Sequence, residues 1–256
     1  SKIFTRISMD ELESSPIKWE AFYKTGEIVK SDKKVPRPHQ VNAIENTIKG
    51  FKSADKGKLF MACGTGKTFT ALCIAEKFAG KNKTVLFLVP SLALMNQTVA
   101  DWVIETNIGI NAYSVCSDSS IGKKKSEDSL GITTHDLAYP ATTDAQTLSE
   151  KINVAEKNKM NVVFATYQSI AVIEEAQKEY GFPEFDLVIC DEAHRTTGAK
   201  YDGDDESSFV KIHSNENIKA KKRLYMTATP RIYGDAAKDK AEEMKAEVYS
   251  MDDISK

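Results

Sequence analysis

The chain has 256 residues, of which 41% are hydrophobic, and 35 basic and 37 acidic side chains give it a formal net charge of −2. It can therefore bury one large core or two small ones. The balanced charge excludes a globally basic nucleic-acid-binding protein, although a local basic groove is compatible with it. The four cysteines show no zinc or disulfide spacing. Because no signal peptide or membrane-spanning run is visible, we expect a cytoplasmic protein without membrane contact.

Short apolar runs alternate with longer segments of helical period. This alternation predicts an α/β fold with a mostly parallel central sheet of about seven strands and helices on both faces. The strands are predicted at 58–62, 84–89, 112–116, 161–165, 187–190, 223–226 and 247–249. The helices are predicted at 38–51, 67–79, 92–105, 144–158, 167–179 and 235–245. Ser91 and Thr143 are expected as N-caps, residues 8–11 as a capping box in an N-terminal helical extension over 1–36, and residues 117–131 as a surface loop.

A glycine-rich turn follows the first predicted strand and opens a helix. It reads Gly64-Thr65-Gly66-Lys67-Thr68, and its glycines allow successive backbone N–H groups to point at one anion. Lys67 would bind the β- and γ-phosphates, and the Thr68 hydroxyl would bind Mg²⁺. The pattern G-x-x-x-x-G-K-[ST] is met except at its first position, where Met61 stands. The turn predicts a nucleoside-triphosphate site.

An acidic pair follows the buried strand predicted at 187–190. That strand would deliver Asp191 and Glu192 to the carboxyl edge of the sheet, where α/β proteins bind ligands. Asp191 would hold the Mg²⁺ ion, and Glu192 would orient and deprotonate the attacking water. By itself the pair could be a solvated strand end, but the phosphate-binding turn upstream favours ATP hydrolysis.

A third segment is expected to contact this pair. His194, two positions after Glu192, can form a hydrogen bond across to the turn Thr227-Ala228-Thr229-Pro230. The hydroxyls of Thr227 and Thr229 suit a relay that reports the nucleotide state. The alternatives are an ordinary surface histidine and an ordinary turn.

Together these motifs resemble superfamily 2 helicases and translocases. Residues 64–68 are similar to motif I, 191–194 to the DEAH form of motif II, and 227–230 to motif III. The resemblance implies a first RecA-like lobe over 37–256, with ATP and Mg²⁺ as cofactors. It also makes Arg37-Pro38-His39-Gln40 similar to the element before motif I, whose Gln40 would read the adenine edge.

The resemblance extends to segments that would contact nucleic acid. Each lies after a strand at a helix start, where hydroxyl and N–H groups suit phosphate oxygens. Ordinary helix capping is the alternative for each of them. The residues are Pro90 and Ser91, which resemble motif Ia, Thr142 and Thr143, and the later turn of Thr166, Tyr167, Gln168 and Ser169.

Residues 61–68, 140–144 and 224–234 are similar, more narrowly, to the translocase segment of Type ISP restriction-modification enzymes, which are related to Type I. This resemblance implies movement along double-stranded DNA, a preceding nuclease, and a following second RecA-like lobe and methyltransferase. Because the second lobe supplies arginines that reach the γ-phosphate, we expect this chain to be a fragment, or one partner of a split motor, with weak or no activity alone. The alternatives are a lobe of a repair or RNA helicase, and an ATP-gated nucleic-acid-binding module without significant turnover.

Overall fold

The computed structural model describes residue 9 and residues 15–116, 141–196, 198–200, 211–229 and 247–249. The chain divides into two compact units, Ser1–Val35 and Pro36–Lys256. In the first unit, the short helix α2 (Trp19–Thr25) carries Trp19 in ring contact with Phe22 and Tyr23. The capping box predicted at 8–11 lies, Met9 apart, outside the described residues. No helix in the described part of the chain is long and apolar enough to cross a membrane.

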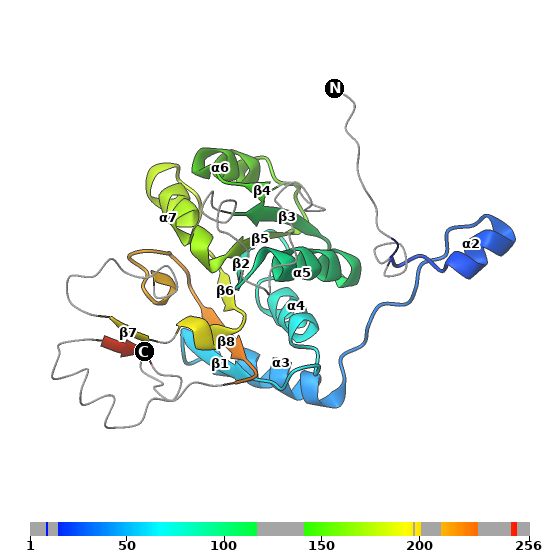
Figure 1. Cartoon of the computed structure of the whole chain (residues 1–256), viewed down its shortest axis with the longest axis horizontal. Coiled ribbons are helices and arrows are strands. Elements are labelled where there is room, and N and C mark those ends of the chain that lie inside the picture. Colours follow the sequence, from blue (N-terminus) through cyan, green and yellow to red (C-terminus); the bar gives the residue numbers. More distant parts are fainter. Residues whose placement is uncertain are drawn as a thin grey trace. The chain divides into compact units, whose positions relative to one another are not determined.

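The second unit is built on a seven-stranded sheet in which every pairing is parallel (Figure 1). In spatial order the strands are β1 (Lys56–Phe60), β8 (Arg223–Thr227), β6 (Leu187–Cys190), β2 (Thr84–Val89), β5 (Met160–Thr166), β3 (Ile110–Val115) and β4 (Ala141–Thr142). Because all strands run the same way, their carboxyl ends meet at one edge of the sheet. The predicted α/β class and parallel sheet are confirmed.

Two details of the predicted sheet are wrong. The seventh strand is β4, which at two residues is too short to show a period, whereas the strand at 247–249, β9 (Glu247–Tyr249), pairs antiparallel with β7 (Gly198–Lys200) in a separate ribbon. A three-residue apolar run does not reveal which sheet it joins. The first strand begins and ends two residues earlier than predicted, because the chain leaves the sheet after Phe60 although Met61 and Ala62 continue the apolar run.

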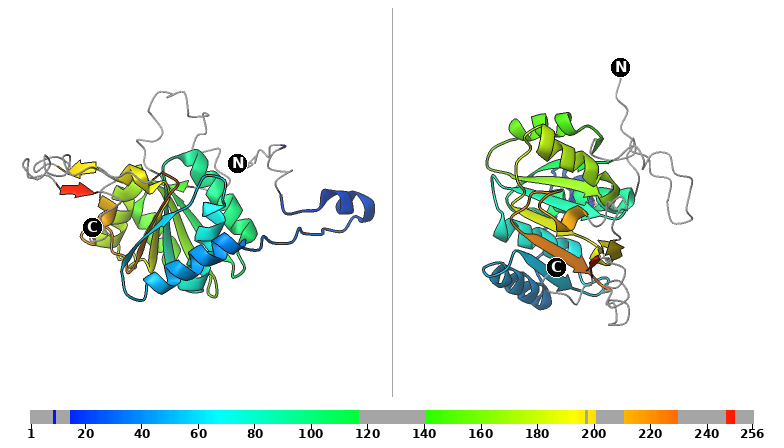
Figure 2. Two further views of the ribbon diagram at one scale, coloured as in Figure 1. Left: turned by 90° about the horizontal axis from the view of Figure 1, so that it is seen from below. Right: turned by 90° about the vertical axis from the view of Figure 1, so that its left-hand side faces the viewer.

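Helices cover both faces of the sheet (Figure 2). In the described residues of the second unit the helices are α3 (Pro38–Gly50), α4 (Lys67–Phe78), α5 (Leu92–Glu105), α6 (Ala145–Asn153) and α7 (Ile170–Glu179), and the 3-10 turns are η3 (Tyr167–Ser169), η4 (Ala193–Thr196) and η5 (Lys211–His213). Ser91 caps α5 as predicted, its hydroxyl accepting from the N–H of Leu94. The predicted cap Thr143 is wrong: α6 begins one residue later, so the Asp144 carboxylate accepts from the N–H of Thr147 at 2.6 Å. α6 also ends well before residue 158, and the helix predicted at 235–245 lies outside the described residues.

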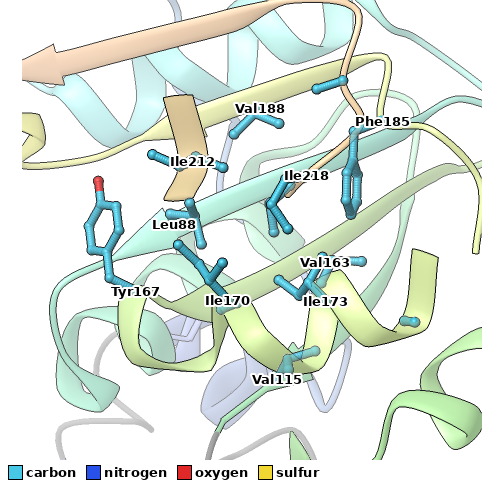
Figure 3. Close-up of a cluster of buried hydrophobic side chains, with 14 of the residues drawn as sticks. Leu88, Val115, Val163, Tyr167, Ile170, Ile173, Phe185, Val188, Ile212 and Ile218 are labelled. Carbon is cyan, nitrogen blue, oxygen red and sulfur yellow. The ribbon is translucent and has the colours of Figure 1, made fainter. Parts of the chain in front are cut away.

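The core follows from the two-residue period of buried strands. Along β2, Val85, Phe87 and Val89 pack with α3, α4 and α5, whereas Leu86 and Leu88 pack with α6 and α7. Both sets are fully buried, as expected for a parallel sheet covered on both faces. Figure 3 shows the second layer, with strand side chains facing α7. This packing fixes the strand ends and therefore the loops that carry the predicted motifs.

Candidate active site

The phosphate-binding turn leaves β1 and enters α4 through two glycines in the left-handed region, Gly64 at φ 75° and Gly66 at φ 84°. Gly66 is the N-cap of α4 and offers no side-chain acceptor, so the first N–H groups of the helix face outward without a side-chain cap. The Thr65 hydroxyl closes the turn by donating to the carbonyl of Ala62 at 2.7 Å. A backbone of this shape is suited to an anion.

Gln40 on α3 forms hydrogen bonds with the backbone of this turn. Its amide nitrogen donates to the carbonyls of Thr65 at 3.0 Å and Gly66 at 3.4 Å, and its amide oxygen accepts from the N–H of Arg37 at 2.8 Å. The side chain is buried, and a Cβ atom on Gly66 would collide with its nitrogen. To contact adenine as predicted, the Gln40 amide would have to break these hydrogen bonds. Arg37, which was predicted to bind the nucleotide with it, is exposed. His39, which the motif pattern did not single out, donates from Nε2 to the carbonyl oxygen of Thr65 at 3.1 Å.

The acidic pair meets the phosphate-binding turn directly. Lys67 Nζ lies 3.6 Å from Glu192 Oε1, and both side chains are largely shielded from solvent. Burial, followed by the charge of Glu192, raises the pKa of Asp191 to about 6, although the N–H of Glu192 and the charge of Lys67 act in the opposite direction. A carboxyl group with a raised pKa beside a cation, at the carboxyl edge of a sheet, is typical of a functional site.

His194 joins the acidic turn to the end of β8. Its Nδ1 lies 3.0 Å from the hydroxyl of Thr227 and 3.4 Å from Glu192 Oε2. The Thr227 hydroxyl in turn accepts from the N–H of Thr229 at 3.2 Å, and the Thr227 carbonyl accepts from the N–H of Met61 at 3.1 Å. The structure thus brings the three predicted motifs together, whereas Pro230 lies outside the described residues.

The predicted nucleic-acid contacts divide into buried and exposed side chains. The side chains of Thr166, Tyr167 and Ser169 are buried, and the hydroxyls of Thr166 and Ser169 are bonded to each other at 2.7 Å. Contact between nucleic acid and this turn stays a prediction, for its backbone groups and for Gln168. Gln168 alone in this turn is exposed.

The other predicted contacts lie at the ends of β2 and β4. Pro90 is buried and Ser91 is exposed but caps α5. Thr142 is half-buried, with its hydroxyl accepting from the N–H of Asp144 at 3.2 Å, and Thr143 is exposed. The segments therefore lie at the expected edge, and Ser91, Thr143 and Gln168 are the exposed residues there.

Two buried aromatic residues support the site without having been predicted to do so. The indole N–H of Trp102 donates to the carbonyl of Thr68 at 3.1 Å, and its ring packs edge-on against Phe87 and Phe164. The hydroxyl of Tyr167 donates to the carbonyl of Asp191 at 2.8 Å. Neither contact leaves a signal in the sequence, because each joins segments that are far apart in the chain.

The donor set fits a magnesium nucleotide. Among the described residues, no group of three or more His, Cys, Asp or Glu side chains could hold a metal ion by itself. Mg²⁺ characteristically needs no such cage, since it is bound through one or two carboxylates, substrate phosphates and water. The Thr68 hydroxyl and the Asp191 carboxylate belong to the turn and strand end that Lys67 and Glu192 bring together.

The sheet, with the phosphate-binding turn set against the acidic turn, has the form of the first RecA-like lobe of superfamily 2 helicases and translocases. Residues 33–232 match the family described as Type III restriction enzyme, res subunit, and the chain belongs to this family. Among curated proteins, it is 30% identical over 82% of its length to an African swine fever virus protein described as a probable helicase. It is 28% identical over 77% of its length to the Type I restriction enzyme EcoAI endonuclease subunit of Escherichia coli.

Two solved structures are more similar. The ATP-dependent Type ISP restriction-modification enzyme LlaBIII bound to DNA is 42% identical over 98% of this chain, with a TM-score of 0.78. A nuclease-deletion mutant of the Type ISP enzyme LlaGI in complex with a DNA substrate mimic is 43% identical over 87% of this chain, with a TM-score of 0.64. The chain spans 21% and 20% of the two curated relatives and 16% and 19% of the two structures. It is a helicase-like lobe related to the Type ISP enzymes.

Proposed function

We propose that residues 37–256 are the first RecA-like ATPase lobe of an ATP-dependent double-stranded DNA translocase in a restriction-modification enzyme. The observation that carries the proposal is the 3.6 Å approach of Lys67 to Glu192, because it joins a phosphate-binding turn to a candidate general base. The similarity to LlaBIII, whose name records ATP dependence and whose structure contains DNA, supports the choice of substrate.

In this proposal each residue of the site has a separate task. The first N–H groups of α4 and the Lys67 ammonium would bind the phosphates, while Thr68 and Asp191 would hold Mg²⁺. When bound, Mg²⁺ would neutralise charge on the β- and γ-phosphates. Glu192 accepts a proton from the attacking water, which requires its carboxylate to leave Lys67 for the water. His194 and Thr227 then connect that movement to β8.

The partners in this proposal are double-stranded DNA and further domains of a longer protein. A second RecA-like lobe would complete the nucleotide cleft and supply arginines to the γ-phosphate, and nuclease and methyltransferase domains would complete the restriction enzyme. The chain spans only a fraction of its relatives, which supports such additional domains. On this basis the isolated chain should bind ATP weakly and show little DNA-stimulated hydrolysis.

The test is Glu192→Gln in the complete natural protein. We expect ATP hydrolysis in the presence of double-stranded DNA to fall about 10²–10⁴-fold, because a general base contributes about that much. ATP affinity should stay within about twofold, since the amide keeps the shape of the carboxylate. Glu175→Gln, on the exposed face of α7, is the matched control. Unchanged hydrolysis in the Glu192 variant would remove this residue from its role.

Two further measurements on the same protein separate the alternatives. A translocase displaces the third strand of a DNA triplex and leaves the duplex intact, whereas a repair or RNA helicase produces single strands. A nucleic-acid clamp binds ATP with negligible steady-state turnover. Strand separation, or binding without turnover, would therefore contradict the translocase proposal.

A further inference from the structure

The peptide unit between Asp191 and Glu192 is held from both sides. Its carbonyl oxygen accepts a hydrogen bond from the Tyr167 hydroxyl at 2.8 Å. Its N–H donates to Asp191 Oδ1 at 3.0 Å. The orientation of this peptide plane is therefore set by the Asp191 side chain, directly after β6, and by the Tyr167 side chain, directly after β5.

The orientation of this plane matters because it determines the conformation of Glu192. The φ angle of Glu192 describes rotation about the bond that follows this peptide, and it is 49°, in the left-handed region that residues with a side chain seldom adopt. Such a conformation persists only where the surrounding structure holds it. Release of the Asp191 carbonyl would allow the peptide to turn and would carry the Glu192 carboxylate away from Lys67 and His194.

Tyr167 reaches this peptide across an intervening strand. In the sheet, β2 lies between β5 and β6, so the two ends are about 10 Å apart. Tyr167 and Leu88 of β2 belong to the same apolar cluster, and Figure 3 shows the Tyr167 ring at one side of it. Burial raises the pKa of Tyr167 well above its usual value, so the hydroxyl keeps its proton and remains a donor. A shorter hydroxyl side chain could not span this distance, and phenylalanine could not donate.

Tyr167 belongs to a turn that is buried except at Gln168. Its neighbour Gln168 is exposed, and the hydroxyls of Thr166 and Ser169 are bonded to each other at 2.7 Å on either side of the pair. This hydrogen bond closes the turn around Tyr167 and Gln168. A ligand that binds at Gln168 would shift the backbone of Tyr167, and the buried ring would transmit that shift to Asp191.

We propose that Tyr167 is a positioning residue, which links occupancy of the turn at 166–169 to the geometry of Glu192 by holding the Asp191–Glu192 peptide. This proposal rests on the proposed function, because it requires nucleic acid on the turn and hydrolysis at Glu192. It assigns to Tyr167 a role at the catalytic site although its side chain reaches neither ATP nor nucleic acid.

The test is Tyr167→Phe in the complete natural protein, because phenylalanine keeps the packing and removes only the hydroxyl. We expect kcat for ATP hydrolysis with double-stranded DNA to fall about tenfold. This is the effect expected from losing one buried hydrogen bond, here the bond to the Asp191 carbonyl that positions Glu192. KM for ATP and DNA affinity should stay within about twofold. An unchanged kcat would overturn the proposal, as would an equal loss in DNA affinity.

Ser149→Ala is the matched control, because it also removes one buried hydroxyl. Ser149 lies on α6, and its hydroxyl donates within that helix to the carbonyl of Ala145 at 3.1 Å. The two variants should lose similar thermal stability, and only Tyr167→Phe should lose kcat. Equal losses of kcat would show that core packing, and not the bond to Asp191, is responsible.

A crystal structure of the Tyr167→Phe protein tests the inference separately from the proposed function. We expect Glu192 to leave the left-handed region and the Asp191–Glu192 peptide to turn. Retention of a positive φ at Glu192 would overturn the positioning role. If the wild-type protein shows no DNA-stimulated hydrolysis at all, the proposed function fails, whatever the conformation of Glu192.

Discussion

Two aspartates flank β6, one at each end, and their pKa values are shifted in opposite directions. At the amino end, burial tends to raise the pKa of Asp186, but hydrogen bonds from Lys221 at 2.7 Å and the N–H of Thr84 at 3.0 Å, with the charge of Lys83, lower it overall. At the carboxyl end, burial and the neighbouring Glu192 raise the pKa of Asp191 to about 6. The partners of Asp186 more than offset the effect of burial on its charge, whereas those of Asp191 do not.

The amino end of β6 therefore contributes to stability, whereas its carboxyl end contributes to the candidate active site. The groups around Asp186 stabilise its charged form, so that end of the sheet contributes to folding. Asp191 is buried with a charge that its surroundings only partly compensate, which costs stability unless a cation binds. Four predictions test this comparison, in order of expected size.

Gly66→Ala should have the largest effect, because Gly66 lies at the functional edge. The new Cβ would displace the Gln40 amide and would force alanine into the left-handed region, so we expect ATP affinity in the complete protein to fall about 100-fold. Gly64→Ala is the matched control: its φ is 75°, but a Cβ there meets nothing within 4 Å, so about tenfold or less is expected. Nucleotide titration measures both. Equal losses would show that Gln40 does not support the turn.

Asp191→Asn should stabilise the protein in buffer without Mg²⁺ or nucleotide. Because the folded pKa is raised above the unfolded value, the charged form costs stability as pH rises through about 6. Removal of the charge should therefore raise the free energy of unfolding by on the order of 1–3 kcal/mol above pH 6, with no gain below about pH 4. Urea denaturation at several pH values measures it. Destabilisation at pH 8 would contradict the prediction.

Asp186→Asn should have the opposite sign. Its folded pKa is lowered, so its contribution to stability is present above the unfolded pKa of about 4 and is lost as pH falls through the folded pKa. The lysine partners are half-exposed and screened by solvent, so we expect a loss of about 1 kcal/mol at pH 7. The same denaturation series applies. If the two substitutions shift stability in the same direction, the contrast between the strand ends fails.

Gln168→Ala should have the smallest effect. The side chain is exposed beside a buried turn, so its removal should leave the melting temperature unchanged and weaken DNA binding a few-fold, as expected for a single polar contact. Thr166→Ala is the companion variant, since it breaks the buried hydroxyl pair and should lower stability by about 1 kcal/mol. Fluorescence anisotropy with duplex DNA distinguishes the two. Unchanged DNA affinity for Gln168→Ala would remove this turn from the nucleic-acid surface.

Much of the nucleotide half follows from the sequence because its chemistry demands particular residues at strand ends. Lys67, Asp191 and His194 were identified in this way, and a parallel sheet necessarily brings such ends to one edge. The nucleic-acid half is less predictable, because position after a strand does not tell whether a side chain turns outward. Tyr167 shows this: it was expected to contact nucleic acid, yet packing across β2 buries it.

Long-range pairing also escapes prediction from local pattern. The short strand β4 and the separate ribbon of β7 and β9 arise from partners distant in the chain. Whether Thr143 or Asp144 caps α6 depends on a difference of one residue in where the helix begins. The spacing of apolar residues does not define a helix start that closely.

The strand order has a consequence for how the protein is made. Within the described residues β1 pairs with β8 alone, and about 160 residues separate them in the chain. At roughly 5–20 residues per second, the ribosome needs on the order of ten to thirty seconds to complete the partner of β1 after β1 itself has emerged. The phosphate-binding turn follows a strand that stays unpaired during that interval. The phosphate-binding turn of this lobe should therefore reach its final structure only after the β2–β5 centre of the sheet has formed.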